Sequence, residues 1–241
     1  MLSYGTKYVK QIIPPAIQLE KEDQEKEDMT LYTREYEEDK IRYVGTGYNL
    51  NGRFFRHGKG RLYFEDGSLE YEGDFFHDAV SGRGTCYWES GSVMYEGEWK
   101  DGQWFGQGRN YWEDGTLRIE GSFAAGLLHG RGRFYKQSGK LYAEGTFKNA
   151  KANGEVRQYD EESGLLYYEG NYVDDCAHGH GRLYQANGKL EYEGEVKYSE
   201  LTGYGRSYSE DGELLHEGRF LKGNPIKTPT EKNDEKVFGL Q

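Results

Sequence analysis

A glycine-rich pattern recurs every 24 residues along most of this 241-residue chain. One part of the pattern is a Glu-Gly pair, usually preceded by tyrosine, and the other part is Gly-x-Gly. The Glu-Gly glycines are Gly73, Gly97, Gly121, Gly145, Gly170, Gly194 and Gly218, with a single step of 25 residues among steps of 24. A fixed period of this length predicts a stack of similar supersecondary units rather than an ordinary two-layer globule.

Each repeat unit has the pattern of two β-strands. Residues 69–75 alternate with period two, as a strand does. Asp114-Gly115 and its equivalents favour two-residue hairpin turns of type I′, which need positive φ at both positions. Glycine is 35 of the residues and proline only 4, which suits many tight turns. We therefore predict an all-β fold, an elongated single-sheet antiparallel β-meander solenoid with about fourteen strands over residues 49–223 and non-repeat tails.

The predicted turn also sets the register of the strands. With Asp114 and Gly115 as the loop, Trp112 faces Leu117. The same counting places arginine opposite glutamate in six of the seven units, and only Thr85 breaks the series. The six pairs are Arg61–Glu72, Arg109–Glu120, Arg133–Glu144, Arg157–Glu169, Arg182–Glu193 and Arg206–Glu217. An exposed cross-strand pair contributes only ~0.2–1 kcal/mol, so we expect these pairs to fix register more than to add stability.

A column of mostly aromatic residues follows each Glu-Gly pair on the other face. These rings either pack between successive units or line a ligand groove, since a single sheet leaves one face uncovered. Trp104 and Phe105, which we place in a hairpin loop, and Trp112 add further apolar surface. We predict a partner-binding groove along which a peptide segment lies over residues 95–150. Its residues are Trp99, Trp104, Phe105, Trp112, Phe123, Phe147 and Tyr172.

The repeat resembles that of the MORN family (membrane occupation and recognition nexus). The family unit is similar to Tyr-x-Gly-x-Trp-x-x-Gly-x-x-x-Gly-x-Gly, and residues 95–108 match it almost completely. The resemblance covers about residues 43–223, although each unit is one residue longer than the usual form. It implies an elongated single-sheet solenoid with a lengthwise groove. It also implies protein binding in cytoskeletal and ciliary assemblies.

The ends of the chain depart from the repeat. In the first copy, 13 residues separate Gly45 from Gly58, against nine elsewhere, so we expect residues 46–55 to form an enlarged loop or a bulged capping unit. We divide the chain into an acidic, extended arm (1–40), a solenoid of about seven to eight units (41–223) and a tail (224–241). Three apolar residues of the arm are its predicted partner-binding anchors, and the groove is one place where they would bind. They are Ile12, Ile13 and Ile17.

Composition excludes several functions. Acidic residues number 42 and basic residues 31, a net charge of −11. This charge disfavours nucleic acid as a partner and makes membrane binding weak or absent. No phosphate loop, nucleophile elbow or kinase motif occurs, so we expect no enzyme activity and no cofactor. The one metal-like cluster consists of Cys176, His178 and His180 with Asp174 and Asp175, and we predict no metal site because no other repeat supplies ligands.

We therefore expect a non-enzymatic scaffold or adaptor. Its partners would be proteins of a cytoskeletal or ciliary assembly, including extended peptide segments, and self-association is compatible with the pattern. The location would be cytoplasmic and cytoskeleton-associated, at the cilium or axoneme for a ciliary assembly. Two alternatives remain open: a phospholipid or membrane-contact module, which the family name suggests, and an accessory subunit of an enzyme.

Overall fold

The computed structural model describes residues 35–37 and 40–226. The described chain divides into two compact units. The N-terminal unit comprises residues 35–37, 40–140 and 147–150, and the C-terminal unit comprises residues 141–146 and 151–226. The predicted arm anchors Ile12, Ile13 and Ile17 lie outside the described residues, so partner binding by the arm stays a prediction.

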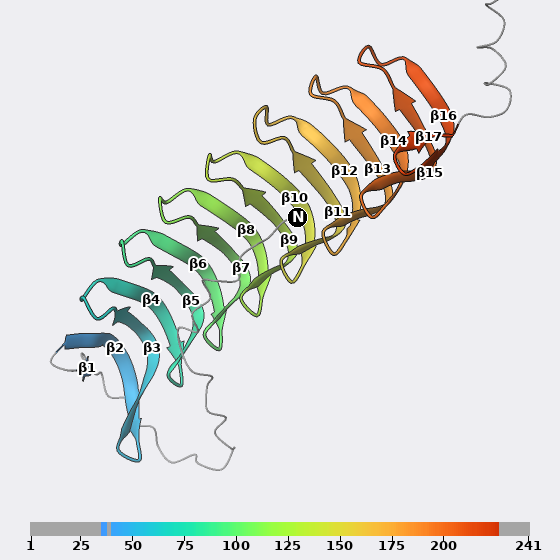
Figure 1. The fold of residues 1–241 in the computed structure, drawn as a ribbon. Coiled ribbons are helices and arrows are strands. Elements are labelled where there is room, and N and C mark those ends of the chain that lie inside the picture. The colour runs from blue at the N-terminus through green and yellow to red at the C-terminus, as the bar shows by residue number, and fades with distance from the viewer. Residues whose placement is uncertain (1–34, 38–39, 227–241) are drawn as a thin grey trace, which may run out of the picture. The chain divides into compact units, whose positions relative to one another are not determined.

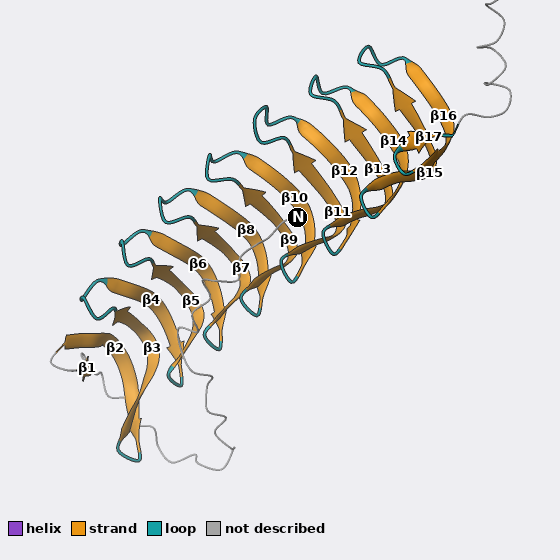
Figure 2. Ribbon diagram, in the orientation of Figure 1, coloured by secondary structure: helices purple, strands orange, loops and turns teal. Residues whose placement is uncertain are grey.

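Every element in the described part of the chain is a strand or a turn, with no helix (Figure 2). The strands of the N-terminal unit are β1 (Glu35–Glu37), β2 (Lys40–Leu50), β3 (Arg53–Tyr63), β4 (Leu69–Phe76), β5 (Ala79–Tyr87), β6 (Val93–Lys100), β7 (Gln103–Tyr111), β8 (Leu117–Ala124) and β9 (Leu127–Tyr135). Strand β10 (Leu141–Lys148) contributes residues to both units. The C-terminal unit continues with β11 (Lys151–Tyr159), β12 (Leu166–Val173), β13 (Cys176–Tyr184), β14 (Leu190–Lys197), β15 (Glu200–Tyr208), β16 (Leu214–Leu221) and β17 (Asn224–Pro225).

Within each unit, every strand pairs antiparallel with the next strand in sequence (Figure 1). This is the predicted meander with two strands per repeat, and the all-β fold class is confirmed. Fourteen strands, β3 to β16, fall within residues 49–223 as predicted. The short strands β1 and β17 lie in the segments that we predicted as arm and tail.

The predicted charge register is confirmed within the units. Arg109 lies opposite Glu120 and Arg157 opposite Glu169, while Thr85 lies opposite Glu96 as expected. The pairs Arg61–Glu72, Arg182–Glu193 and Arg206–Glu217 have the same register. The pairing of Arg133 with Glu144, which belong to different units, stays a prediction.

The two-residue type I′ turn that we predicted at Asp114-Gly115 was wrong. Trp112 donates its N–H to Thr116 O and Gly115 donates its N–H to Trp112 O, both at 2.9 Å, so the loop has three residues. Only Gly115 in this loop has positive φ, as in a type I turn that ends in a left-handed residue. Leu117 therefore pairs with Tyr111 rather than with Trp112. The register then shifts by one between Asn110 and Tyr111, which cancels the extra loop residue.

The two-residue type I′ turns lie at the other end of the hairpins. Asp101 (φ 49°) and Gly102 (φ 76°) join Lys100 to its partner Gln103. The second turn residue also binds a neighbouring strand, since Gly102 donates its N–H to Val80 O at 2.8 Å. Sequence analysis missed these turns because half of them contain no glycine. The four turns without glycine are His77-Asp78, Asn149-Ala150, Asp174-Asp175 and Tyr198-Ser199.

The atypical first repeat is a long hairpin rather than an enlarged loop. Strands β2 and β3 each run for 11 residues and meet at Asn51-Gly52, a further type I′ turn. The register shifts between Gly45 and Gly47, so Thr46 is an extra, bulged residue. Of the two predicted alternatives, the bulged unit is the one observed.

One arginine is missing from the series of charge pairs, at Thr85. This residue lies opposite Glu72 on one side and Glu96 on the other. Both glutamates are partly exposed and pair with Arg61 and Arg109 respectively. We predict that Thr85→Arg raises the free energy of unfolding by about 0.5 kcal/mol, because it fills this gap with a charge that both carboxylates attract.

The measurement is denaturant unfolding at low and high salt. Thr85→Gln is the control, since it supplies length without charge. The gain with arginine should disappear at high salt, where the attraction between exposed charges is screened. An equal gain with glutamine would show that side-chain length and not charge is responsible.

Candidate interaction surface

The apolar face of the N-terminal unit is built around tyrosines whose rings lie over pairs of glycines. Tyr95 is fully buried, and its hydroxyl donates to Glu98 O at 3.0 Å. Gly97 and Gly108 face each other beside it, and a Cβ added at Gly97 would lie 2.6 Å from Tyr95 Oη. That distance is far inside van der Waals contact, so glycine is required. The Gly-x-Gly half of the repeat is thus a seat for the tyrosine.

Edge-to-face ring contacts join one repeat to the next. The ring centroid of Tyr95 lies 5.2 Å from that of Trp99 and 5.3 Å from that of Phe123 in the following hairpin. Trp99 also contacts Tyr71 of the preceding repeat at 5.4 Å, and its indole N–H donates to Gly84 O at 3.0 Å. Aromatic pairs prefer this geometry and stabilise the fold beyond the area that they bury.

Four of the predicted groove residues are buried in the core of their own unit. Trp99 is 4% exposed and Phe123 3%, while Phe147 is 2% and Tyr172 8% exposed. The structure brings Trp99, Phe123 and Trp104 together through Tyr95. Phe147 contacts Phe134 at 6.2 Å, and Tyr172 belongs to the C-terminal unit, where its hydroxyl donates to Gln158 Oε1 at 3.0 Å. These burials favour the packing interpretation, and partner binding by these rings stays a prediction.

Trp104 and Phe105 lie in a strand and not in a loop, contrary to our expectation. Both belong to β7, so their side chains point to opposite faces of the sheet. Trp104 stacks on Tyr95, with centroids 4.5 Å apart and planes 6° apart. Phe105 is 42% exposed on the other face, with Lys100 Nζ 5.5 Å from its ring. Trp112 lies in the following turn, beneath the Arg118 guanidinium at 4.3 Å.

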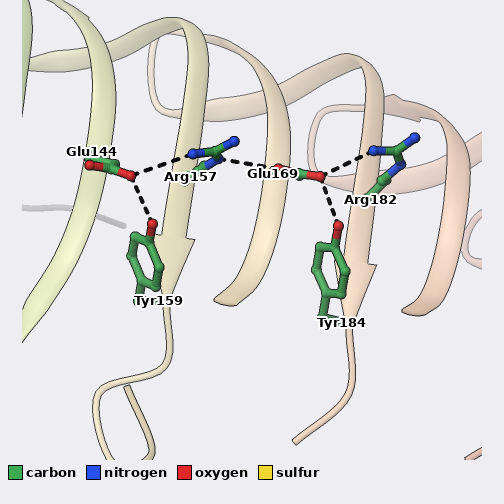
Figure 3. Close-up of polar contacts among 6 residues, drawn as sticks. All are labelled: Glu144, Arg157, Tyr159, Glu169, Arg182 and Tyr184. Carbon is green, nitrogen blue, oxygen red and sulfur yellow. Dashed lines mark hydrogen bonds and ion pairs between the residues drawn. The ribbon is translucent and has the colours of Figure 1, made fainter. Parts of the chain in front are cut away.

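Phe105 lies on the same side of β7 as Arg109, which belongs to a ladder of arginine, glutamate and tyrosine. Figure 3 shows the ladder of the C-terminal unit. In the C-terminal unit, Arg157 lies 3.8 Å from Glu144 and 3.3 Å from Glu169. Arg182 then lies 3.3 Å from Glu169 and 3.2 Å from Glu193. Each arginine thus joins the glutamates of two successive repeats, and we call this side of the sheet the ladder face.

A tyrosine completes each step of the ladder. Tyr159 donates its hydroxyl to Glu144 at 2.8 Å and Tyr184 donates to Glu169 at 2.7 Å, as Figure 3 shows. Tyr111 makes the same bond to Glu96 in the N-terminal unit. Sequence analysis paired the charges but missed these tyrosines. The available signal was a tyrosine two residues after each arginine.

The ladder changes the pKa values of its members. The hydrogen bond from Tyr184, opposed by partial burial and assisted by Arg182 and Arg157, lowers the pKa of Glu169. Burial and then the hydrogen bond to Glu96 raise the pKa of Tyr111 to about 12. At neutral pH Glu169 therefore accepts as a carboxylate and Tyr111 donates as a neutral phenol. These shifts follow from pairing, and they indicate a structural network rather than a catalytic group.

Other kinds of site find no support in the described residues. No group of three or more His, Cys, Asp or Glu side chains is placed there to hold a metal ion. Cys86 is buried, which raises the pKa of its thiol to about 12 and leaves it unreactive at neutral pH. Across residues 35–37 and 40–226 there is also no helix of the length and hydropathy that a membrane span requires.

Comparison with protein families agrees with this geometry. The MORN repeat matches residues 71–93, 95–117, 168–189 and 192–213. The MORN repeat variant matches residues 56–77 and 128–149, and the matched segments together span more than half of the chain. The chain is a MORN-repeat protein. No curated protein matches it.

The family assignment identifies the chain as a repeat-based binding module, since MORN repeats generally bind proteins or membranes. The structure also shows what the residues of the MORN unit do in this chain. The tyrosine covers the glycine pair, the following aromatic residue packs against the tyrosine of the preceding repeat, and the glycines make room for the tyrosine ring. The ladder face carries the charged side chains.

The ladder makes the fold sensitive to acid. A carboxyl whose pKa is lowered by folding stabilises the protein above its unfolded pKa of ~4.3 and loses that effect as pH falls through the folded value. We predict that Glu169→Gln lowers the free energy of unfolding by about 1 kcal/mol at neutral pH, a value already reduced for solvent screening of a side chain that is 23% exposed. The difference from wild type should shrink below about pH 4.

Unfolding measured across this pH range tests the prediction. Glu155→Gln is the matched control, because Glu155 is exposed in the neighbouring strand β11 and the described chain gives it no ion pair. A pH-independent loss in Glu169→Gln would contradict the assignment of the effect to the carboxylate.

The two tryptophans can be separated by substitution. Trp99→Ala should lower the free energy of unfolding by about 3–5 kcal/mol, as expected for a fully packed ring. Trp99→Phe should lower it much less, because phenylalanine occupies this place at Phe123 and Phe147. Trp104→Ala removes a half-buried stacked ring and should lower it by about 1–2 kcal/mol. If Trp99→Ala left thermal unfolding unchanged while weakening partner binding, the packing interpretation would fail.

Proposed function

We propose that this MORN-repeat protein is a non-enzymatic scaffold that binds protein partners in a cytoskeletal or ciliary assembly of the cytoplasm. The observation that carries the proposal is the ladder face, on which side chains recur at every second strand. Repeat folds of this kind present wide surfaces to which proteins bind, while their core residues are buried between successive repeats. The cytoskeletal or ciliary setting rests on the family resemblance alone.

Charge favours protein over membrane as the partner. The net charge of −11 repels anionic lipid, and attraction of a basic residue to such a surface amounts to only ~1 kcal/mol. On the ladder face the arginines already pair with glutamates of the chain itself. These observations support a protein partner, with the membrane-contact alternative as the reading to be tested against it.

Proximity labelling with the full chain in ciliated cells tests the proposal. We expect the labelled proteins to be enriched in components of the cytoskeleton or cilium. Gly84→Val is the control, because a side chain at Gly84 collides with the Tyr71 ring and should destroy the repeat and the labelling together. Sedimentation with phosphoinositide-rich vesicles is run in parallel, and little binding is expected.

Two results would contradict the scaffold. Saturable, salt-sensitive vesicle binding in the low micromolar range would instead favour a membrane-contact module. Labelling of a single enzyme whose activity requires the chain would favour an accessory subunit.

A further inference from the structure

Exposed apolar side chains are concentrated in the C-terminal unit. Among the described residues, the N-terminal unit exposes only Phe76 and Phe105 of the large apolar side chains. The C-terminal unit exposes Leu165, Tyr167, Val173, Tyr198, Tyr204, Leu214, Leu215, Leu221 and Ile226. Such side chains indicate an interaction site only where several of them lie close together on one face.

Tyr198 is the least expected of these residues. It is 70% exposed and is the first residue of a type I′ turn, with φ at 52°. Equivalent turn positions hold small or polar residues such as Asn149 and Asp174, at φ 51° and 48°. Asparagine and aspartate adopt this left-handed conformation far more readily than bulky aromatic residues do. Tyrosine at this position exposes most of a ring in a backbone conformation that suits smaller polar residues better.

Tyr198 lies within a cluster on the ladder face. Its ring lies 5.6 Å from that of His178 in β13. Tyr204 in β15 is 59% exposed, while Val173 in β12 and Leu221 in β16 are 50% and 59% exposed. Alternation along the strands puts these side chains on the side that carries Arg182 and Arg206. We call Val173, His178, Tyr198, Tyr204 and Leu221 the aromatic face; β12 and β16 lie four strand spacings apart, about 19 Å.

Negative charge surrounds the aromatic face. Residues 151–226 contain 15 acidic and eight basic residues, a net charge of −7, whereas residues 40–140 contain 13 and 14. Asp174, Glu195 and Glu200 are exposed on or beside the aromatic face. None of them forms an ion pair with another described residue. Two basic residues lie in the same region: Lys197, with Nζ 5.6 Å from the Tyr198 ring, and Arg219, opposite Tyr204.

We propose that the aromatic face docks a basic, extended segment of a partner protein that also carries aliphatic side chains. The inference rests on the proposed protein-binding function and adds the place and the chemistry of the partner. Tyrosine gives a large contact area at low conformational cost and attracts cationic groups to its ring. The carboxylates of Asp174, Glu195 and Glu200, which form no ion pair with a described residue, attract lysine or arginine of the segment. Glu195 also accepts a hydrogen bond from Tyr204 N–H at 3.3 Å. Val173 and Leu221 receive the aliphatic residues of the segment.

The probe is a fluorescent peptide of about ten residues, long enough to cross from β12 to β16 when extended. It alternates lysine with isoleucine, and two matched peptides carry glutamate for lysine or serine for isoleucine. We expect the full chain to bind the lysine–isoleucine peptide more tightly than either matched peptide, with affinity that falls as salt is raised.

Two substitutions that the chain itself tolerates elsewhere locate the binding. Tyr198→Asn installs the residue of Asn149, and Tyr204→Gln installs the residue of Gln107. Each should weaken peptide binding about tenfold or more, as loss of an aromatic anchor does. Thermal unfolding should be unchanged for Tyr204→Gln and unchanged or raised for Tyr198→Asn, because asparagine suits the turn. Phe105→Ser in the N-terminal unit is the control and should bind like wild type.

The proposal is overturned if both tyrosine variants bind the peptide as wild type does, if Phe105→Ser weakens binding as much, or if the glutamate peptide binds equally well. Failure of the wild-type chain to bind the lysine–isoleucine peptide overturns it as well. The proximity labelling described above distinguishes these failures from failure of the scaffold function. Labelling that persists in Tyr198→Asn and Tyr204→Gln would leave protein binding intact and place it elsewhere on the chain.

Discussion

The packing of a tyrosine ring over two opposed glycines is the contact on which the repeats that contain this tyrosine depend. The ring can lie against the backbone only because neither strand carries a Cβ at that point, as at Gly97 and Gly108 beneath Tyr95. Its hydroxyl then reaches a backbone carbonyl three residues along its own strand. With the ring held in this way, its edge and face are presented to Trp99 and Phe123, and through them to the adjacent repeat.

The repeats that lack this tyrosine show that the volume must be filled. Ile119 stands where Tyr95 stands one repeat earlier, and the Leu128 side chain lies over the glycine pair instead, so that a Cβ at Gly132 would lie 2.6 Å from Leu128 Cδ1. Ala143 is smaller still, and Val156 replaces the second glycine there, with Cγ2 at 2.9 Å from a Cβ at Gly145. The break in the Gly-x-Gly series is therefore a compensation within the core and not a loss of the repeat.

The fold could be predicted from sequence because period, glycine spacing and charge pairing all agree. The turn types could not, since a three-residue loop followed by a bulge gives Arg109 the same partner as a two-residue loop without one. The charge pairing depends on the loop length and the bulge together, so it does not determine either one by itself. The placement of Trp104 and Phe105 was wrong for a related reason. The true turn, Asp101-Gly102, is so short that β7 begins at Gln103, before both residues.

The two faces of the sheet impose different demands on aromatic residues. On the core face, neighbouring repeats bury Trp99 and Phe123. The repeat pattern places an aromatic residue at these positions but does not show whether its ring is packed or exposed. On the ladder face, the arginines, glutamates and tyrosines already bind one another. An added aromatic residue has no core there to pack against. Tyr198 and Tyr204 lie on that face with most of their surface in solvent. Side chains exposed to this degree bury little surface in the core, and for that reason the ladder face is the better place to look for a partner.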